Sequence, residues 1–121
     1  STGDVLTINT SGNGWIKGTS WSYGSDRSLK QNIVPLPYGL DALLRLDPVQ
    51  FDYIDGDARQ FGFVAQDLQP VIPELVVSTE RDGQPTILSL RTTNLVPVLV
   101  RGIQELAQRL HALEQRAGGT P

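Results

Sequence analysis

The sequence predicts a small α+β fold with β-hairpins and a long C-terminal helix, preceded by a short β-rich stretch. Short alternating segments separated by Gly, Asn, Asp and Pro are typical of strands and turns. Apolar residues at steps of three and four near the C-terminus indicate one amphipathic helix. A chain of 121 residues is one compact domain with appendages, near the size at which oligomerisation commonly adds stability.

Residues 1–24 differ in composition from the rest of the chain. They contain both tryptophans and no proline, whereas all eight prolines follow Lys30. Residues 5–8 and 14–17 are expected to form small strands between Gly, Asn and Ser turns. Because such strands cannot build a core alone, the stretch is interpreted as the end of a longer β-rich stem. The alternative is an N-terminal extension of the domain that follows.

The next segments alternate between short helices and strands. Residues 40–46 are predicted to form a short helix, which stops because Asp47 precedes Pro48 and is disfavoured at helical angles. Residues 49–53 alternate between apolar and polar and predict a half-buried strand. Residues 61–64 are expected to return alongside it after a turn or a protruding loop.

The middle of the chain predicts a further helical piece and the clearest hairpin. Residues 66–72 are expected to be helical, interrupted by a proline and closed by Pro73. Residues 75–77 and 86–90 are rich in β-branched and apolar side chains. They flank a polar Asp-Gly turn at 82–83, which is the composition of a β-hairpin.

A long helix is predicted over about residues 94–116, capped by Thr93 or Asn94. Its apolar residues fill the a and d positions of about three heptads: Val96, Leu99, Ile103, Leu106, Leu110, Leu113 and Ala117. Arg109 and Glu114 fall at g and e, where an ion pair between parallel helices is favoured. Small and apolar flanks widen this face, so we expect a trimeric coiled coil. The alternative is that the stripe packs on its own chain.

One serine and one lysine, five residues apart, have the chemistry of a nucleophile and its base. A serine hydroxyl is activated when a base takes its proton, and a desolvated lysine can be that base. Ser25 and Lys30 suit these roles; Lys17 is the only other lysine, and arginine does not deprotonate in proteins. The alternative is that Ser25 is a turn residue after Gly24 and Lys30 a solvated surface charge.

Four segments carry a resemblance to a known family: residues 25–33 (SDRSLKQNI), 39–51 (GLDALLRLDPVQF), 62–68 (GFVAQDL) and 73–76 (PELV). They closely resemble the C-terminal intramolecular chaperone domain of phage tailspikes, endosialidases and tail fibres. A related domain occurs in membrane-tethered myelin regulatory factors. The resemblance covers about residues 25–115, in order and with few gaps.

The resemblance implies a homotrimer that promotes folding of the upstream fibre stem in the same polypeptide and then releases itself. Release implies a self-cleaving serine endopeptidase, acting once and in cis, with Ser25 and Lys30 as its dyad. The cleaved bond could be Gly24-Ser25 or Ser25-Asp26, and the sequence does not decide between them. Asp26 and Asn32 could orient Lys30 or the scissile peptide.

The resemblance also suggests how the chain is divided. Residues 1–24 would end the fibre stem, 25–91 form the chaperone and autoprotease domain, 92–117 form the trimerisation helix and 118–121 a tail. The expected location is a virion tail fibre or tailspike precursor that folds in the host bacterial cytoplasm.

Other function classes receive little support. A net charge of −3 gives no basic footprint, so we expect neither nucleic acid nor a membrane as a partner. There is no cysteine, the thirteen acidic residues lack metal-ligand spacing, and no phosphate-binding glycine loop occurs, so no metal and no cofactor is expected. His111 is the only histidine, which excludes a Ser-His-Asp triad.

Two alternatives to the cleaving chaperone remain. The domain could be a trimerisation cap that stays attached, with an inert dyad. It could instead be a receptor-binding tip that uses the loops at 55–60 and 81–84.

Overall fold

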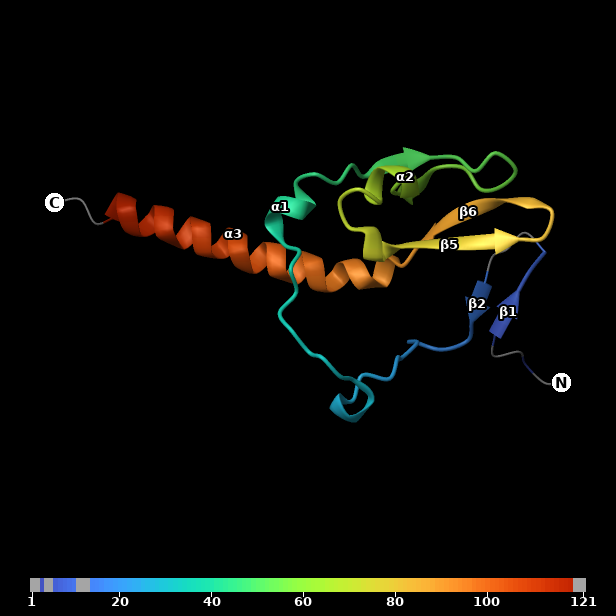
Figure 1. The fold of residues 1–121 in the computed structure, drawn as a ribbon, viewed down its shortest axis with the longest axis horizontal. Coiled ribbons are helices and arrows are strands. Elements are labelled where there is room, and N and C mark those ends of the chain that lie inside the picture. Colours follow the sequence, from blue (N-terminus) through green and yellow to red (C-terminus); the bar gives the residue numbers. More distant parts are fainter. Residues whose placement is uncertain (1–2, 4–5, 11–13, 119–121) are drawn as a thin grey trace. The chain divides into compact units, whose positions relative to one another are not determined.

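A computed structural model of the chain describes residue 3, residues 6–10 and residues 14–118, apart from the side chain of Arg81. The chain divides into two compact units. One comprises residues 1–34 with 54–56, and the other residues 35–53 with 57–121. Figure 1 shows the elements in order.

The N-terminal unit contains one short antiparallel pair of strands. β1 (Leu6–Ile8) pairs with β2 (Gly14–Ile16), so that Thr7 lies opposite Trp15. This confirms the two predicted strands, although Val5 lies outside the described residues. Every residue of both strands is exposed, as expected for an isolated pair without a core. A 3₁₀ helix, η1 (Arg27–Leu29), follows and is the sky-blue turn in Figure 1.

The first two strands of the second unit form the predicted antiparallel pair. β3 (Val49–Phe51) runs antiparallel to β4 (Gln60–Gly62). The loop between them is fixed at its base, because the Arg59 backbone N–H donates to Asp52 Oδ1 over 2.7 Å. Arg59 adopts a left-handed φ of 55°, which explains why the return strand begins only after it.

The predicted Asp-Gly hairpin is confirmed and is longer than expected. β5 (Val76–Arg81) pairs with β6 (Gln84–Leu90), leaving a two-residue turn. Gly83 has a φ of 66°, a left-handed conformation that costs glycine little, and the strand register shifts between Thr79 and Arg81 beside the turn. In Figure 1 this hairpin leads directly into the long helix.

The short helices are present but shorter than predicted. α1 (Leu40–Leu43) is followed by turns as far as Leu46, in which the N–H groups of Arg45 and Leu46 donate to carbonyls three residues earlier. The chain leaves the helical conformation before Asp47 and Pro48. α2 (Ala65–Leu68) is a single turn of helix. The expectation that Pro73 closes a helix is wrong: it begins a 3₁₀ helix, η2 (Pro73–Leu75), because its fixed φ suits a first helical position.

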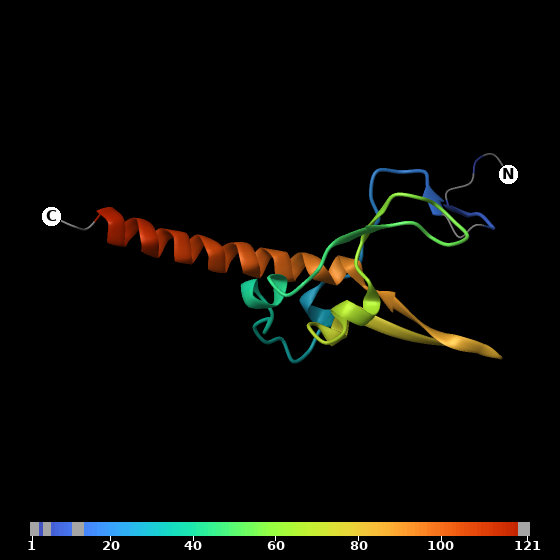
Figure 2. The same cartoon turned by 90° about the horizontal axis from the view of Figure 1, so that it is seen from above.

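The long C-terminal helix is confirmed. A 3₁₀ turn, η3 (Thr92–Asn94), leads into α3 (Leu95–Gly118), and Pro97 is tolerated in its first turn. α1 lies against α3 in both Figure 1 and Figure 2. The contact is close because Gly102 has no side chain, and a Cβ there would run into Leu43 Cδ1. The buried apolar core lies where these helices and η2 meet: Leu40, Ala42, Leu68, Ile72, Leu75 and Val98.

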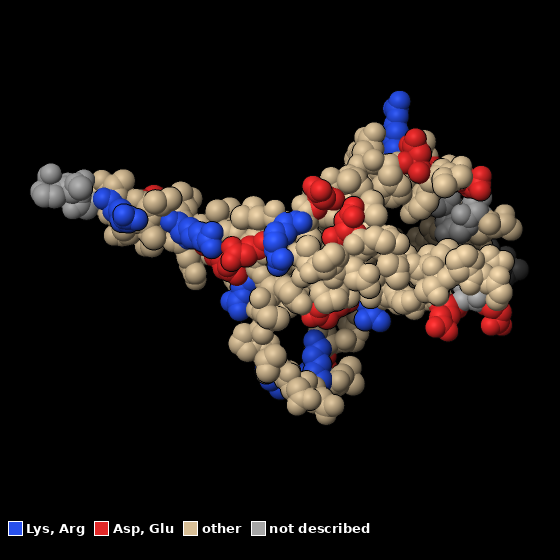
Figure 3. Space-filling model, turned by 45° about the horizontal axis from the view of Figure 1, so that its top comes forward, with Lys and Arg blue, Asp and Glu red and all other residues tan. Residues whose placement is uncertain are grey.

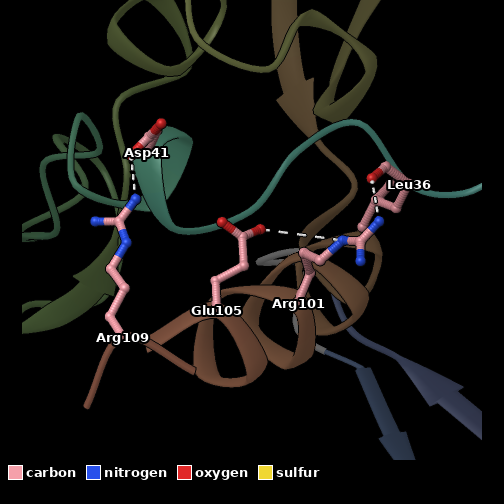
Figure 4. A network of polar contacts seen from close by, with 5 residues as sticks. All are labelled: Leu36, Asp41, Arg101, Glu105 and Arg109. Atoms are coloured by element: carbon pink, nitrogen blue, oxygen red, sulfur yellow. Dashed lines mark hydrogen bonds and ion pairs between the residues drawn. The ribbon is translucent and has the colours of Figure 1, made fainter. Parts of the chain in front are cut away.

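Polar contacts reinforce the attachment of α1 and the segment before it to α3 (Figure 4). Arg101 Nη2 donates to the Leu36 carbonyl over 3.2 Å, and its Nε lies 4.0 Å from Glu105 Oε1. One to two turns further along α3, Arg109 Nη2 lies 3.5 Å from Asp41 Oδ1. These contacts come from one face of α3, the same face that carries Gly102.

The heptad stripe lies outside that face and is uncovered by its own chain. The six large residues of the stripe are 44–66% exposed. The alternative in which the stripe packs on its own domain is therefore wrong. The α+β class, the hairpins and the long helix are confirmed, whereas the trimeric coiled coil stays a prediction. Among the described residues, no helix is both long enough and apolar enough to span a membrane.

Candidate functional site

The structure brings the two predicted dyad residues together. Lys30 Nζ donates a hydrogen bond to Ser25 Oγ over 2.6 Å, and both residues are exposed. They lie immediately before and after the turn that contains η1. A serine hydroxyl within hydrogen-bonding reach of an amine is the starting geometry for proton transfer.

The turn itself is built by local hydrogen bonds. Asp26 is the N-cap of η1, and its Oδ2 accepts hydrogen bonds from the Ser28 backbone N–H, over 2.9 Å, and from Ser28 Oγ. Leu29 N–H donates to the Asp26 carbonyl, and Lys30 N–H donates to the Arg27 carbonyl, each over 3.0 Å. These four hydrogen bonds all lie within residues 26–30.

The Ser28 hydrogen bonds also affect the charge state of the cap. The hydrogen bond from Ser28 Oγ, followed by that from its backbone N–H, lowers the pKa of Asp26 below its ordinary value. At neutral pH Asp26 is therefore an acceptor-only carboxylate. The sequence analysis did not identify Ser28; an Asp with a hydroxyl residue two positions on is the signal that could have identified it.

The remaining residues named for this site have backbone roles at most. Gly24 precedes Ser25, and a Cβ built on Gly24 would lie 3.2 Å from Leu29 Cδ1, so the backbone passes close to that side chain. Asn32 has a left-handed φ of 54°, a conformation that asparagine tolerates better than most residues. Its position turns the chain just after Lys30.

The dyad lies in an apolar stretch of chain that is uncovered. Five large apolar residues between positions 21 and 34 are each more than half exposed: Trp21, Tyr23, Leu29, Ile33 and Val34. These side chains are therefore accessible in the single chain.

Other candidate sites offer less chemistry. The described residues contain no group of three or more His, Cys, Asp or Glu side chains that could hold a metal ion. His111 is exposed on α3, and its Nε2 lies 3.4 Å from Gln115 Nε2. On the face drawn in Figure 3, basic side chains lie mostly along the long helix with acidic ones beside them, and no continuous basic patch forms.

One apolar hollow of about 310 Å³ lies where η2 meets the start of α3. Tyr38 stands at this hollow and donates from its hydroxyl to Glu74 Oε1 over 2.8 Å. The hydrogen bond to Glu74, with smaller contributions from burial and from the Glu74 charge, raises the pKa of Tyr38. The Tyr38 hydroxyl and the Glu74 carboxylate at this hollow are hydrogen-bonded to each other, so it is a weaker catalytic candidate than the dyad.

Comparison with known proteins gives a consistent result. Residues 25–77 match the peptidase family described as "Chaperone of endosialidase". Over 97 residues the chain is 36% identical to the long tail fiber protein Gp37 of Enterobacteria phage K3 and to that of Enterobacteria phage T2. It is 30% identical over 97 residues to the Gp37 protein of Enterobacteria phage M1.

The matched region is a large part of this chain and a small part of the relatives. It covers 76% of the chain in the first two comparisons and 74% in the third. It spans 8% of the phage K3 protein, 7% of the phage T2 protein and 38% of the phage M1 protein. The matched family segment includes both Ser25 and Lys30.

Proposed function

We propose that this chain is a self-releasing folding module of a phage tail fibre, because residues 25–77 match the family described as "Chaperone of endosialidase" and 97 residues resemble the Gp37 tail fibre proteins. It would associate as a homotrimer, promote folding of the upstream stem of the same polypeptide, and then separate from it by autoproteolysis. Its location would be the precursor of a virion tail fibre, folding in the host cytoplasm.

The observation that carries the catalytic part of this proposal is the 2.6 Å hydrogen bond between Lys30 Nζ and Ser25 Oγ. The lysine must act as a neutral amine, which takes the hydroxyl proton as Oγ attacks a neighbouring carbonyl carbon. A tetrahedral intermediate forms, and backbone N–H groups would have to stabilise its oxyanion. Catalytic roles are proposed only for Ser25 and Lys30.

The bond that breaks is adjacent to Ser25. Attack on the Gly24 carbonyl expels the Ser25 nitrogen, which receives the proton from Lys30, and leaves Gly24 esterified to Oγ. Water then hydrolyses the ester, giving a Gly24 carboxylate and a chain that begins with Ser25. Cleavage at the Ser25-Asp26 bond is the alternative, in which Ser25 becomes the new C-terminus.

Support for the chaperone part comes from α3. Its exposed stripe faces away from the contacts to α1, so helices from other copies could cover it without disturbing the core. Intertwined fibres fold slowly because distant segments must pair before their contacts stabilise them. Gathering three C-termini raises the local concentration of the stems and sets their alignment.

The uncovered apolar residues around the dyad support coupling of cleavage to assembly. A general base must be an unprotonated amine, and removal of water favours the uncharged form of an amine in general. A partner that covers the apolar stretch would exclude water from Lys30. Cleavage would then follow assembly and report that the trimer has formed.

The test is intact-mass spectrometry of the chain with its upstream stem restored. We expect wild type to separate into two fragments beside Ser25, and we expect Ser25→Ala and Lys30→Ala to stay whole. Lys17→Ala and Ser22→Ala, which change the same residue types nearby, should cleave as wild type does. The fragment masses identify the broken bond.

Two outcomes would contradict the proposal. Cleavage that continues in Ser25→Ala rejects the nucleophile. A wild-type chain that stays whole as a folded trimer rejects catalysis and supports the attached trimerisation cap instead. A receptor-binding tip at the 55–60 and 81–84 loops stays a prediction.

A further inference from the structure

We propose that Asp26 is a positioning residue for the reaction at Ser25, because its carboxylate holds the turn that brings Lys30 to the serine hydroxyl. This inference rests on the proposed function. Asp26 itself does not contact Ser25 Oγ or Lys30 Nζ in the hydrogen bonds described above. It acts through Ser28 and the backbone of η1.

The distance between the dyad residues explains why a turn is needed. Five residues of extended chain span roughly 17 Å, whereas a lysine side chain reaches only about 6 Å from its Cα. Lys30 Nζ can therefore meet Ser25 Oγ only when the intervening backbone folds back. The 3₁₀ turn at Arg27–Leu29 provides that reversal.

The Asp26 carboxylate is the side-chain component that stabilises this reversal. Its Oδ2 accepts both the Ser28 backbone N–H and the Ser28 hydroxyl, while its own carbonyl accepts the Leu29 N–H. An aspartate that binds the backbone two residues on is a turn device in its own right. Both Asp26 and Ser28 are exposed, so burial adds little to the turn in a single chain.

The experiment compares cleavage rates in the stem-containing chain, made by pulse-labelled cell-free synthesis and followed on gels and by mass. Asp26→Ala should cleave about fivefold more slowly or worse, the effect expected from losing one helix cap. Asp26→Asn should restore the rate to within about twofold, because asparagine caps as well as aspartate. Ser28→Ala, which keeps the backbone donor, should fall between them.

A second measurement separates positioning from general loss of structure. Trimer content and thermal midpoint should be unchanged in Asp26→Ala, since the residue is exposed. In a Ser25→Ala background, which should not cleave, amide hydrogen exchange at Leu29 and Lys30 should quicken in Asp26→Ala and not in Asp26→Asn. Ser22→Ala serves as the control for a change at a nearby exposed side chain.

The outcomes distinguish this inference from the proposed function. An Asp26→Ala chain that cleaves at the wild-type rate overturns the positioning role while leaving Ser25 and Lys30 as the dyad. An Asp26→Asn chain as slow as Asp26→Ala also overturns it, because the charge rather than the cap would then matter. A wild-type chain that never cleaves rejects the proposed function, and unchanged exchange in Asp26→Ala then independently rejects the turn.

Discussion

The exposed stripe of α3 gives the sharpest test of self-association. Leu110 is 56% exposed in the single chain. Burying a leucine side chain completely is worth about 1.5–3 kcal/mol, so covering the exposed part adds about 0.8–1.7 kcal/mol per chain. Three chains together gain roughly 2.5–5 kcal/mol, which is about two to four orders of magnitude in the association constant.

Leu110→Asp should remove this contribution and place three carboxylates together at the seam, so the calculated loss is a lower limit. Gln108→Asp is the matched control, because it introduces the same residue at an exposed position of α3 outside the stripe. Sedimentation equilibrium over a range of concentrations should show a trimer for wild type and Gln108→Asp, and a monomer for Leu110→Asp. Circular dichroism checks that α3 is retained. Equal association of the two variants would refute the assignment of the seam.

Two further predictions concern the second unit. Gly102→Ala should lower the free energy of unfolding by about 1 kcal/mol, because forcing Leu43 aside costs about 1–3 kcal/mol and the helix gains only about 1 kcal/mol from alanine. Gly118→Ala is the control: its Cβ would meet nothing within 4 Å, so this variant should be neutral or stabilising. The two variants are compared with wild type by their urea midpoints at one protein concentration. A Gly102→Ala chain that is more stable than wild type contradicts the close packing. Because the pKa of Tyr38 is raised, its bond to Glu74 should stabilise the fold fully below the ordinary tyrosine pKa of about 10 and be lost as pH rises through the folded value. Tyr38→Phe should be less stable at neutral pH, and this difference should shrink in urea titrations above about pH 10; a difference that stays constant rejects the contribution.

The fold was predictable where local chemistry decides it. An Asp-Gly pair between β-branched runs predicts a tight hairpin, and Gly83 adopts a left-handed conformation that glycine tolerates. The seven-residue spacing of apolar side chains on α3 likewise predicts a helix whatever its surroundings. The short helices were less predictable, because a single turn at α2 depends on packing of Leu68 in the core rather than on its own sequence.

The site was predictable in part for the same reason. Ser25 and Lys30 could be named from their chemistry, but their meeting depends on a turn closed by Asp26 and Ser28. The cap has a sequence signal, an Asp followed two residues later by a Ser, although this pair is common enough to be overlooked. Which carbonyl the serine attacks depends on backbone geometry beyond the reach of sequence spacing.

The preformed dyad has a consequence for when cleavage occurs. Lys30 Nζ already meets Ser25 Oγ in a single chain, so assembly need not create this contact. The same amine is exposed to water in the single chain, whereas a base must be an unprotonated amine. Under the proposed function, assembly must therefore supply the exclusion of water. In the stem-containing chain, Leu110→Asp should accordingly stay whole at neutral pH although its dyad is unaltered, while Gln108→Asp should cleave. A monomeric Leu110→Asp chain that cleaves at the wild-type rate would show that the local turn alone is sufficient.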